Sequence, residues 1–427
     1  MRLNELSALE ALSLIQNGDV TSEALVDACL QRIGVRESSV RAWEFLDPEK
    51  ALEQARAADH LKNRGLLRGI PVGVKDIMDT TDMPTAYGSP IFDSHQPAVD
   101  ASVVTLIRAA GGIVLGKTVT AELAVLHPGK TANPRNLAHT PGGSSSGSAA
   151  AVADFMVPLA LGTQTAGSII RPASFCGVVG FKPTFGLINR AGIKPCAESL
   201  DTVGVFGRSV KDVAFLASIL TGRSYLNVSE IQTPPCIGLC HTYEWTQAAP
   251  ETIRAIEDAG AQLRECGAMV EEIELPEPFS RLAHAQLTIM IYEMVRSLAH
   301  EYYAHRDQLS NTLKEMIASG QTITPVVYDD AVAVAVECRT LLKRVFSGLD
   351  VLLAPSARGE APEGLSSTGD PVFNRIWTLL HVPCINIPAF TGPRNLPVGI
   401  QMVSPIGADA RLLAVSNWAF NHLGQKV

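Results

Sequence analysis

Two short loops rich in glycine and serine, at residues 141–148 (PGGSSSGS) and 162–168 (GTQTAGS), flank one long apolar stretch. Residues this small let backbone N–H groups turn inward and approach another group closely. Each loop carries one serine of interest, Ser144 in the first and Ser168 in the second. A nucleophilic serine needs such surroundings, because it requires a base and nearby N–H donors for a developing oxyanion.

A lysine lies in a third apolar run, residues 70–77 (IPVGVKDI). Burying a charged amine is costly, so burial lowers the lysine pKa and favours the neutral form. A neutral amine is a competent general base near pH 7. The alternative is structural: Lys75 lies at the end of a strand and pairs with Asp76 or Asp79. The two serine loops favour the catalytic interpretation.

Composition limits the class of protein. The chain has 427 residues, 46% hydrophobic and 18% charged, so we expect a large buried core rather than disorder. A net charge of −8 gives no electrostatic footprint for nucleic acid. The eight cysteines are scattered singly and complete no zinc site, which predicts reduced thiols in a cytoplasmic protein with no metal and no cofactor.

The pattern of apolar residues indicates one α/β domain over residues 1–427. Residues 1–64 have helical periodicity, with a capping box at Ser7–Glu10. From Ile70 onward short apolar runs alternate with helical patterns, which predicts a sheet covered by helices. No Gly-, Ser- or Pro-rich linker divides the chain, and we expect no targeting segment and no membrane span.

Residues 225–345 form a more helical and more variable section of this domain. Expected strands are at 236–239 and 270–275, and expected helices at 251–266, 279–305 and 328–346. Further strands are expected at 350–354 and 397–402.

Two familiar motifs occur in contexts that do not suit them. Residues 111–118 (GGIVLGKT) satisfy the phosphate-loop pattern, but the segment is itself strand-like and follows a helical pattern. Residues 143–147 (GSSSG) satisfy the nucleophile-elbow pattern of α/β-hydrolases, which needs a strand just before it. Pro141 makes the preceding segment a poor strand. We therefore expect no nucleotide site and no elbow.

Lys75, Ser144 and Ser168, with residues 180–184 (GFKPT), 200–204 (LDTVG) and 396–401 (LPVGIQ), occur in an order that resembles the amidase signature family. The resemblance covers most of the chain. It implies a large mixed central β-sheet covered by helices on both faces. It also implies hydrolysis of amides through a Ser–Ser–Lys triad and an acyl-enzyme.

The resemblance also assigns roles to residues. Ser168 is the nucleophile, Lys75 the base and Ser144 the relay between them, with a cis peptide expected between Ser144 and Ser145. The oxyanion is expected to be held by the backbone N–H groups of Thr165, Ala166, Gly167 and Ser168. The substrate is expected to be a small amide that contacts Ser145, Gln164 and Arg171. A homodimer is a further expectation.

Three departures from the common family pattern point to one branch. Gln164 stands where many members have Asp, Ala166 where they have Gly, and Arg171 lies one position later than their arginine. These features look most like malonamidase, in which the arginine at this position recognises a substrate carboxylate. A guanidinium fits a carboxylate with two hydrogen bonds. The alternative is that Arg171 pairs with a carboxylate of the protein or caps a loop.

Two other functions stay open on the sequence. The first is the amidase-fold subunit of a glutamine-dependent tRNA amidotransferase, which works with partner subunits and RNA. The second is an α/β-hydrolase that uses Ser145 with a downstream Asp and His.

Overall fold

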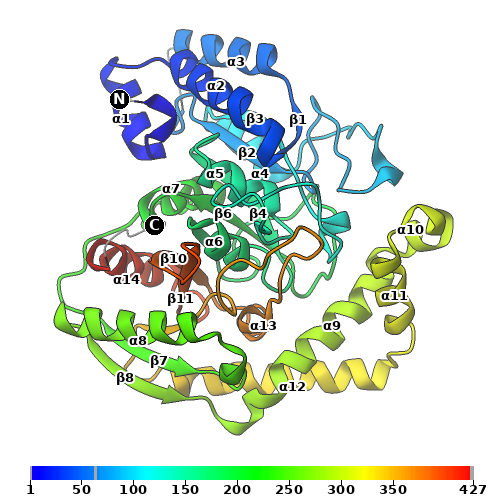
Figure 1. Ribbon diagram of the computed structural model, residues 1–427, viewed down its shortest axis with the longest axis vertical. Helices are drawn as coiled ribbons and strands as arrows, with labels where there is room; N and C mark the ends of the chain where they lie inside the picture. Colours follow the sequence, from blue (N-terminus) through cyan, green and yellow to red (C-terminus); the bar gives the residue numbers. More distant parts are fainter. Residues whose placement is uncertain (1, 62–64, 424–427) are drawn as a thin grey trace.

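The computed structural model describes residues 2–61 and 65–423, and a large mixed sheet runs through it (Figure 1). Within this part of the chain eleven strands form one sheet in the order β1-β3-β2-β4-β6-β5-β10-β11-β9-β7-β8. The strands are β1 (Trp43–Leu46), β2 (Pro71–Lys75), β3 (Ile113–Thr118), β4 (Leu159–Gln164), β5 (Val179–Lys182), β6 (Thr202–Gly207), β7 (Cys236–His241), β8 (Met269–Glu274), β9 (Val351–Pro355), β10 (Cys384–Thr391) and β11 (Pro397–Val403).

The strands pair in both senses. β2 is parallel to β3 and β4, and β7 is parallel to β8 and β9. The remaining pairs, from β4–β6 across to β11–β9 and including β1–β3, are antiparallel. The mixed sheet expected from the family resemblance is confirmed.

Fourteen α-helices accompany the sheet in the described residues. They are α1 (Ala8–Asn17), α2 (Ser22–Val40), α3 (Pro48–His60), α4 (Ser102–Ala109), α5 (Ser146–Ala153), α6 (Ile170–Cys176), α7 (Val210–Thr221), α8 (Pro250–Glu265), α9 (Leu282–Ser297), α10 (Ala299–Ala304), α11 (Asn311–Gly320), α12 (Pro325–Val345), α13 (Val372–Leu379) and α14 (Asp409–His422). Both faces of the sheet are covered. Gly204 of β6 faces Ile169 at the start of α6, whereas Gly207 of the same strand faces α7.

The N-terminal segment is helical as expected, with one exception. Ser7 accepts a hydrogen bond from the Glu10 backbone and the Glu10 side chain returns one, which completes the predicted capping box. The exception is β1, which joins β3 at the edge of the sheet. Helical periodicity missed it because four residues are too few to show the alternation of a strand.

The section 225–345 begins with β7, α8 and β8 and then leaves the sheet as an arm of helices. Figure 1 shows α9 running from the body of the molecule toward α10 and α11, and α12 returning below it. α9 packs against α12 and against α13. The arm therefore reaches back to the part of the protein that carries the serine loops.

Both misleading motifs fall in the contexts that the sequence predicted. Residues 113–118 of the phosphate-loop pattern are strand β3, and helix α4 precedes them. The loop of a phosphate site would instead follow a strand and open a helix. At residues 143–147, α5 begins at Ser146 and no strand of the described chain lies between β3 and α5.

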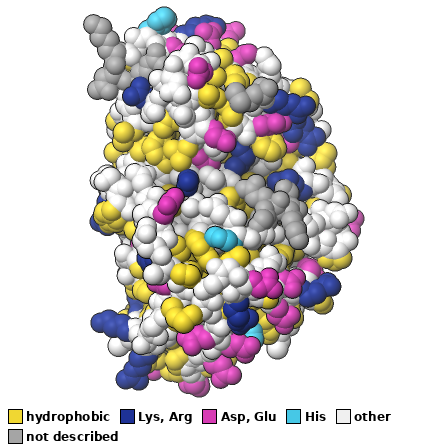
Figure 2. All heavy atoms as spheres, turned by 90° about the vertical axis from the view of Figure 1, so that its left-hand side faces the viewer, with side chains coloured by type: hydrophobic (Ala, Val, Ile, Leu, Met, Phe, Trp, Pro, Cys, Tyr) yellow, Lys and Arg dark blue, Asp and Glu magenta, His cyan; other side chains and the backbone are white. Residues whose placement is uncertain are grey.

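The helices, the cysteines and the charges on one face of the surface also bear on the expectations from the sequence. No helix in the described residues is long and apolar enough to cross a membrane. All eight cysteines are unpaired. On the face seen in Figure 2, basic and acidic side chains alternate with hydrophobic ones, and no stripe of basic residues crosses it.

Gly147, in the first turn of α5, allows the serine loop to pack against the sheet. A Cβ on Gly147 would lie 2.2 Å from the carbonyl oxygen of Ala42 and 2.4 Å from the backbone nitrogen of Val119. We expect Gly147→Ala to destabilise the protein by about 3 kcal/mol or more, because backbone atoms cannot move aside as side chains do. Chemical denaturation measures this change.

Gly34, inside α2, provides the matched control. A Cβ there meets nothing within 4 Å, so Gly34→Ala should be neutral or stabilise the helix by up to about 1 kcal/mol. Equal unfolding midpoints for the two variants would show that the close approach at Gly147 carries no energetic weight.

Candidate active site

Lys75, Ser144 and Ser168 come together at one edge of the sheet. β2 and β4 are parallel neighbours, so their carboxyl ends lie at the same edge. Lys75 is the last residue of β2, and Ser168 lies just beyond the end of β4. Ser144 lies two residues before α5, which packs against both strands. The topology thus brings three distant segments to one place.

Lys75 is fully buried and hydrogen-bonded to two hydroxyl groups. Its Nζ lies 2.8 Å from Ser144 Oγ and 2.8 Å from Thr163 Oγ1. The alternative partner Asp76 instead forms an ion pair with Lys117 at 2.8 Å. Lys75 is therefore directed toward the serine loops.

Burial lowers the pKa of Lys75 to about 7, while the negative charge of Asp201 opposes this shift. Near neutral pH a substantial fraction of Lys75 is then an uncharged amine. Such an amine can accept a proton from the hydroxyl it contacts.

Ser144 and Ser168 are both buried, but their hydrogen bonding differs. Ser144 Oγ lies next to Lys75, whereas the Ser168 hydroxyl has no hydrogen-bond partner among the described residues. Ser168 lines a hollow, so its hydroxyl is left for a ligand or water.

The cis peptide bond lies before Ser144 and not after it. The structure has it between Gly143 and Ser144, so the expected Ser144–Ser145 position is wrong by one residue. The residue before the observed bond is Gly143, which has no side chain, whereas the residue before the expected bond would have been Ser144.

The loop at residues 165–168 presents free N–H groups. None of its four backbone N–H groups has a hydrogen-bond partner within the described part of the chain. Three other side chains fix the loop from outside. Thr165 Oγ1 donates to Asp201, the Thr165 carbonyl accepts from Gln286, and the Ala166 carbonyl accepts from Thr378. The arrangement leaves the N–H groups available for an oxyanion.

Gln164 and Ser145 use their polar groups inside the protein. Gln164 donates to Thr378 and accepts from the N–H groups of Ile169 and Ile170 at the start of α6. Ser145 exchanges hydrogen bonds with the backbone of Thr163. These contacts hold the two loops in place, and substrate contact by Gln164 or Ser145 stays a prediction.

Arg171 is buried in α6, with one nitrogen engaged and two unpartnered. Nη2 donates to the Gly143 carbonyl at 2.7 Å and to Thr368 Oγ1 at 3.1 Å, while Nε and Nη1 have no partner in the described structure. No described carboxylate forms an ion pair with it, so the internal salt bridge is not realised, whereas the bond to the Gly143 carbonyl is a contact of the loop-capping kind. Burial and the neighbouring Arg375 lower the pKa of Arg171 to about 9, which leaves it charged at neutral pH.

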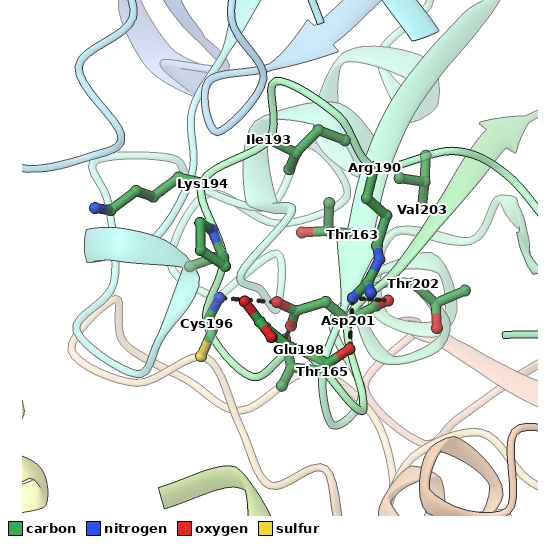
Figure 3. Close-up of a pocket in the computed structure, with 12 residues that line it drawn as sticks. Thr163, Thr165, Arg190, Ile193, Lys194, Cys196, Glu198, Asp201, Thr202 and Val203 are labelled. Atoms are coloured by element: carbon green, nitrogen blue, oxygen red, sulfur yellow. Dashed lines mark hydrogen bonds between the residues drawn. The ribbon is translucent and has the colours of Figure 1, made fainter. Parts of the chain in front are cut away.

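Two hollows border the loop at residues 165–168. The larger, about 390 Å³, is lined by Thr163, Thr165, Arg190 and Asp201 among others (Figure 3). The smaller contains Ser168. Its other lining residues include Arg171 and Arg375 with the apolar side chains of Leu287, Met290 and Met316. Ala124, Thr165 and Cys196 line both.

Several residues of this site escaped the sequence analysis. Thr163 contacts Lys75, Asp201 contacts Thr165, and Gln286 joins the Thr165 carbonyl to Arg375. Thr163 and Asp201 both lie inside segments that the analysis quoted, so their closeness to the serines was a usable signal. Gln286 lies in a helix of the arm and gave no signal.

Comparison with known proteins agrees with this geometry. The amidase family profile matches residues 24–413. One glutamyl-tRNA(Gln) amidotransferase subunit, from Halothermothrix orenii, is 31% identical over 97% of this chain and 96% of its own length. A crystal structure of an amidase superposes with a TM-score of 0.91 at 30% identity, covering 98% of this chain and all of the other. The peptide amidase of Stenotrophomonas maltophilia gives 0.81 at 28% identity, covering 98% and 96%.

The matched residues include Lys75, Ser144 and Ser168 and all eleven strands of the described sheet. The resemblance to malonamidase is not among these findings and remains a proposal. The full-length similarity to amidases, on a chain whose buried lysine meets the first of two loop serines, shows that the protein belongs to the amidase signature family of amide-hydrolysing enzymes.

Proposed function

We propose that this chain hydrolyses a small amide through an acyl-enzyme on Ser168. The observation that carries the proposal is the buried 2.8 Å hydrogen bond between Lys75 Nζ and Ser144 Oγ, at the edge of the sheet where Ser168 lies. The unpartnered Ser168 hydroxyl and the free N–H groups at residues 165–168 support the same assignment.

The reaction proceeds by one proton relay used twice. Ser168 Oγ attacks the amide carbonyl carbon while its proton passes to Ser144 Oγ and the Ser144 proton passes to Lys75. The N–H groups of the loop stabilise the oxyanion. The C–N bond then breaks as Lys75, through Ser144, returns the proton to the leaving nitrogen. Water hydrolyses the ester on Ser168 by the same relay and releases the acid.

The acyl part of the substrate, we propose further, carries a carboxylate. Arg171 has two unpartnered nitrogens, and Arg375 lines the same hollow without an ion-pair partner in the described residues. Two guanidinium groups around one small space repel each other, and an anion relieves that repulsion. A carboxylate can accept a charge-assisted hydrogen bond from an unpartnered nitrogen of Arg171.

Substitutions of Arg171 distinguish its structural hydrogen bond to the Gly143 carbonyl from its proposed contact with a substrate carboxylate. We expect Arg171→Met to lower kcat/KM for malonamate at least about 30-fold more than for propionamide, because a desolvated charge pair contributes about 2–5 kcal/mol. Steady-state kinetics on both amides measures the ratio. Arg171→Lys can still donate to the Gly143 carbonyl but lacks the Nε and Nη1 groups of arginine. It should therefore keep propionamide turnover and still show a lowered kcat/KM for malonamate.

Arg135 offers a matched control, since its guanidinium bonds to the carbonyls of Cys176 and Gly177 away from the hollow. Arg135→Met should leave the ratio between the two amides unchanged. Equal losses for both amides in the Arg171 variants, or a wild-type preference for propionamide, would remove the carboxylate and leave a general amidase.

The curated relatives support a second candidate function, that of the amidase subunit of a tRNA amidotransferase. Their identity to this chain is near 31% and extends over almost their whole length. Glutamine hydrolysis is the discriminating assay, run on the isolated chain and again with the remaining subunits of a bacterial glutamyl-tRNA(Gln) amidotransferase. Glutaminase activity that appears only with those subunits would favour this candidate over an independent amidase.

A further inference from the structure

Asp201 holds the nucleophile loop from the wall of the larger hollow. It lies directly before β6, and its carboxyl group accepts three hydrogen bonds, two of them from Thr165 and Cys196, which Figure 3 draws beside it. One oxygen accepts from Thr165 Oγ1 at 2.5 Å, and the other accepts from the N–H groups of Cys196 at 2.8 Å and Ala197 at 3.0 Å. Thr165 is the first residue of the loop with the free N–H groups, so Asp201 fixes where that loop begins.

The hydrogen bonds of Asp201 are those of an ionised carboxylate. Burial raises the pKa of this carboxyl group, while the three donors oppose the rise. Two of the three partners are backbone N–H groups, which can only donate, and Thr165 Oγ1 donates to the other oxygen, so both carboxylate oxygens act as acceptors. Arg190, whose Nη1 bonds to the Asp201 backbone carbonyl at 3.0 Å, adds a positive charge nearby.

The same carboxylate acts on Lys75. Thr163 in β4 contacts Lys75 Nζ at 2.8 Å, and Asp201 lies directly before β6, the strand that pairs with β4; both residues line the larger hollow. The other titratable group whose charge acts on Lys75 is Cys196, and burial raises the pKa of that thiol so far that it stays neutral. The adjacent Asp76 is neutralised by Lys117. Asp201 is thus the negative charge that faces the lysine.

We propose that Asp201 is a positioning residue of the amidase reaction with two tasks, which rest on the function proposed above. It holds Thr165 so that the N–H groups at residues 165–168 face the substrate carbonyl. Its charge also keeps the proton affinity of Lys75 in the range where the lysine both accepts a proton from Ser144 and returns it to the leaving nitrogen. Without the charge, the amine would be too weak a base and would be slow to take up the proton.

The pH dependence of kcat/KM tests the electrostatic task. In the wild type the rate should rise with pH as Lys75 loses its proton. Asp201→Asn removes the negative charge with little change in size, so the rising limb should move to lower pH by about 1 unit. Thr165→Val removes the hydroxyl contact but keeps the charge, so it should lower kcat while the limb stays in place.

Two further variants separate this effect from general damage. Asp212→Asn changes another buried acid, at the far side of the sheet in α7, and should not move the limb. Asp201→Glu keeps the charge and displaces it by one methylene, so it should lower the rate and keep the limb. This variant also carries the test if Asp201→Asn does not fold, since a limb moved downward in Asp201→Glu would contradict the proposal.

If the rising limb of the kcat/KM profile stays in place in Asp201→Asn, or moves to higher pH, the inference about Asp201 is overturned. Failure of the proposed function gives a different result, because a wild-type profile without a limb near neutral pH would mean that Lys75 is not the base.

Discussion

Ser168→Ala is expected to abolish amide hydrolysis while the protein remains folded. Loss of a nucleophilic serine costs on the order of 10⁶-fold in kcat. The change removes one buried hydroxyl that has no partner in the described structure, so it leaves no orphaned group. Turnover of a primary amide measures the first effect and thermal unfolding the second.

Covalent trapping identifies the nucleophile directly. A fluorophosphonate should label the wild type at Ser168 and should not label Ser168→Ala, as peptide mapping would show. Ser146→Ala is the matched control, because Ser146 opens α5 beside Ser144 and, within the described residues, its hydroxyl bonds only to the Val119 carbonyl. Label on Ser145 instead, or normal turnover in Ser168→Ala, would end the assignment.

Lys75→Met should lower kcat by about 10²–10⁴-fold, the usual contribution of a general base. Methionine has similar length and suits the apolar surroundings, so we expect the fold to be kept. The wild type should also show kcat/KM rising through about pH 7, since burial lowers the pKa of Lys75 to about 7 and only the neutral amine accepts a proton. In Lys75→Met this rise should disappear. Ser144→Ala should reduce the rate by a smaller factor than Lys75→Met.

Lys182 provides the control for this prediction, because it is also a fully buried lysine. Its Nζ donates to the carbonyls of Val382 and Pro183, away from the serines, and burial lowers its pKa too. Lys182→Met should lower the unfolding temperature and leave the pH profile in place. Near-normal rates in Lys75→Met would show that the base is another group.

The segments that determine their own local structure could be predicted from the sequence. The apolar run around Lys75 predicted a buried strand, and the small residues around Ser144 and Ser168 predicted tight loops. The capping box at Ser7 and the strand at residues 113–118 were likewise local, since the energies that set them act between near neighbours. The family resemblance supplied the sheet and the order of the triad.

Contacts between distant segments were decided only by the tertiary structure. Strand order placed Asp201 beside Thr165, and the packing of α9 on α13 brought Gln286 between Thr165 and Arg375. Whether Arg171 would find a carboxylate of the protein was open in the sequence, and the fold surrounds it with Gly143, Thr368 and Arg375 instead. The sequence and its family resemblance predicted which residues carry the chemistry, because residue type and local setting can be read from neighbouring positions. The fold decided the electrostatic environment of these residues. Charges interact through space, and the residues that surround a site come from segments far apart in the sequence.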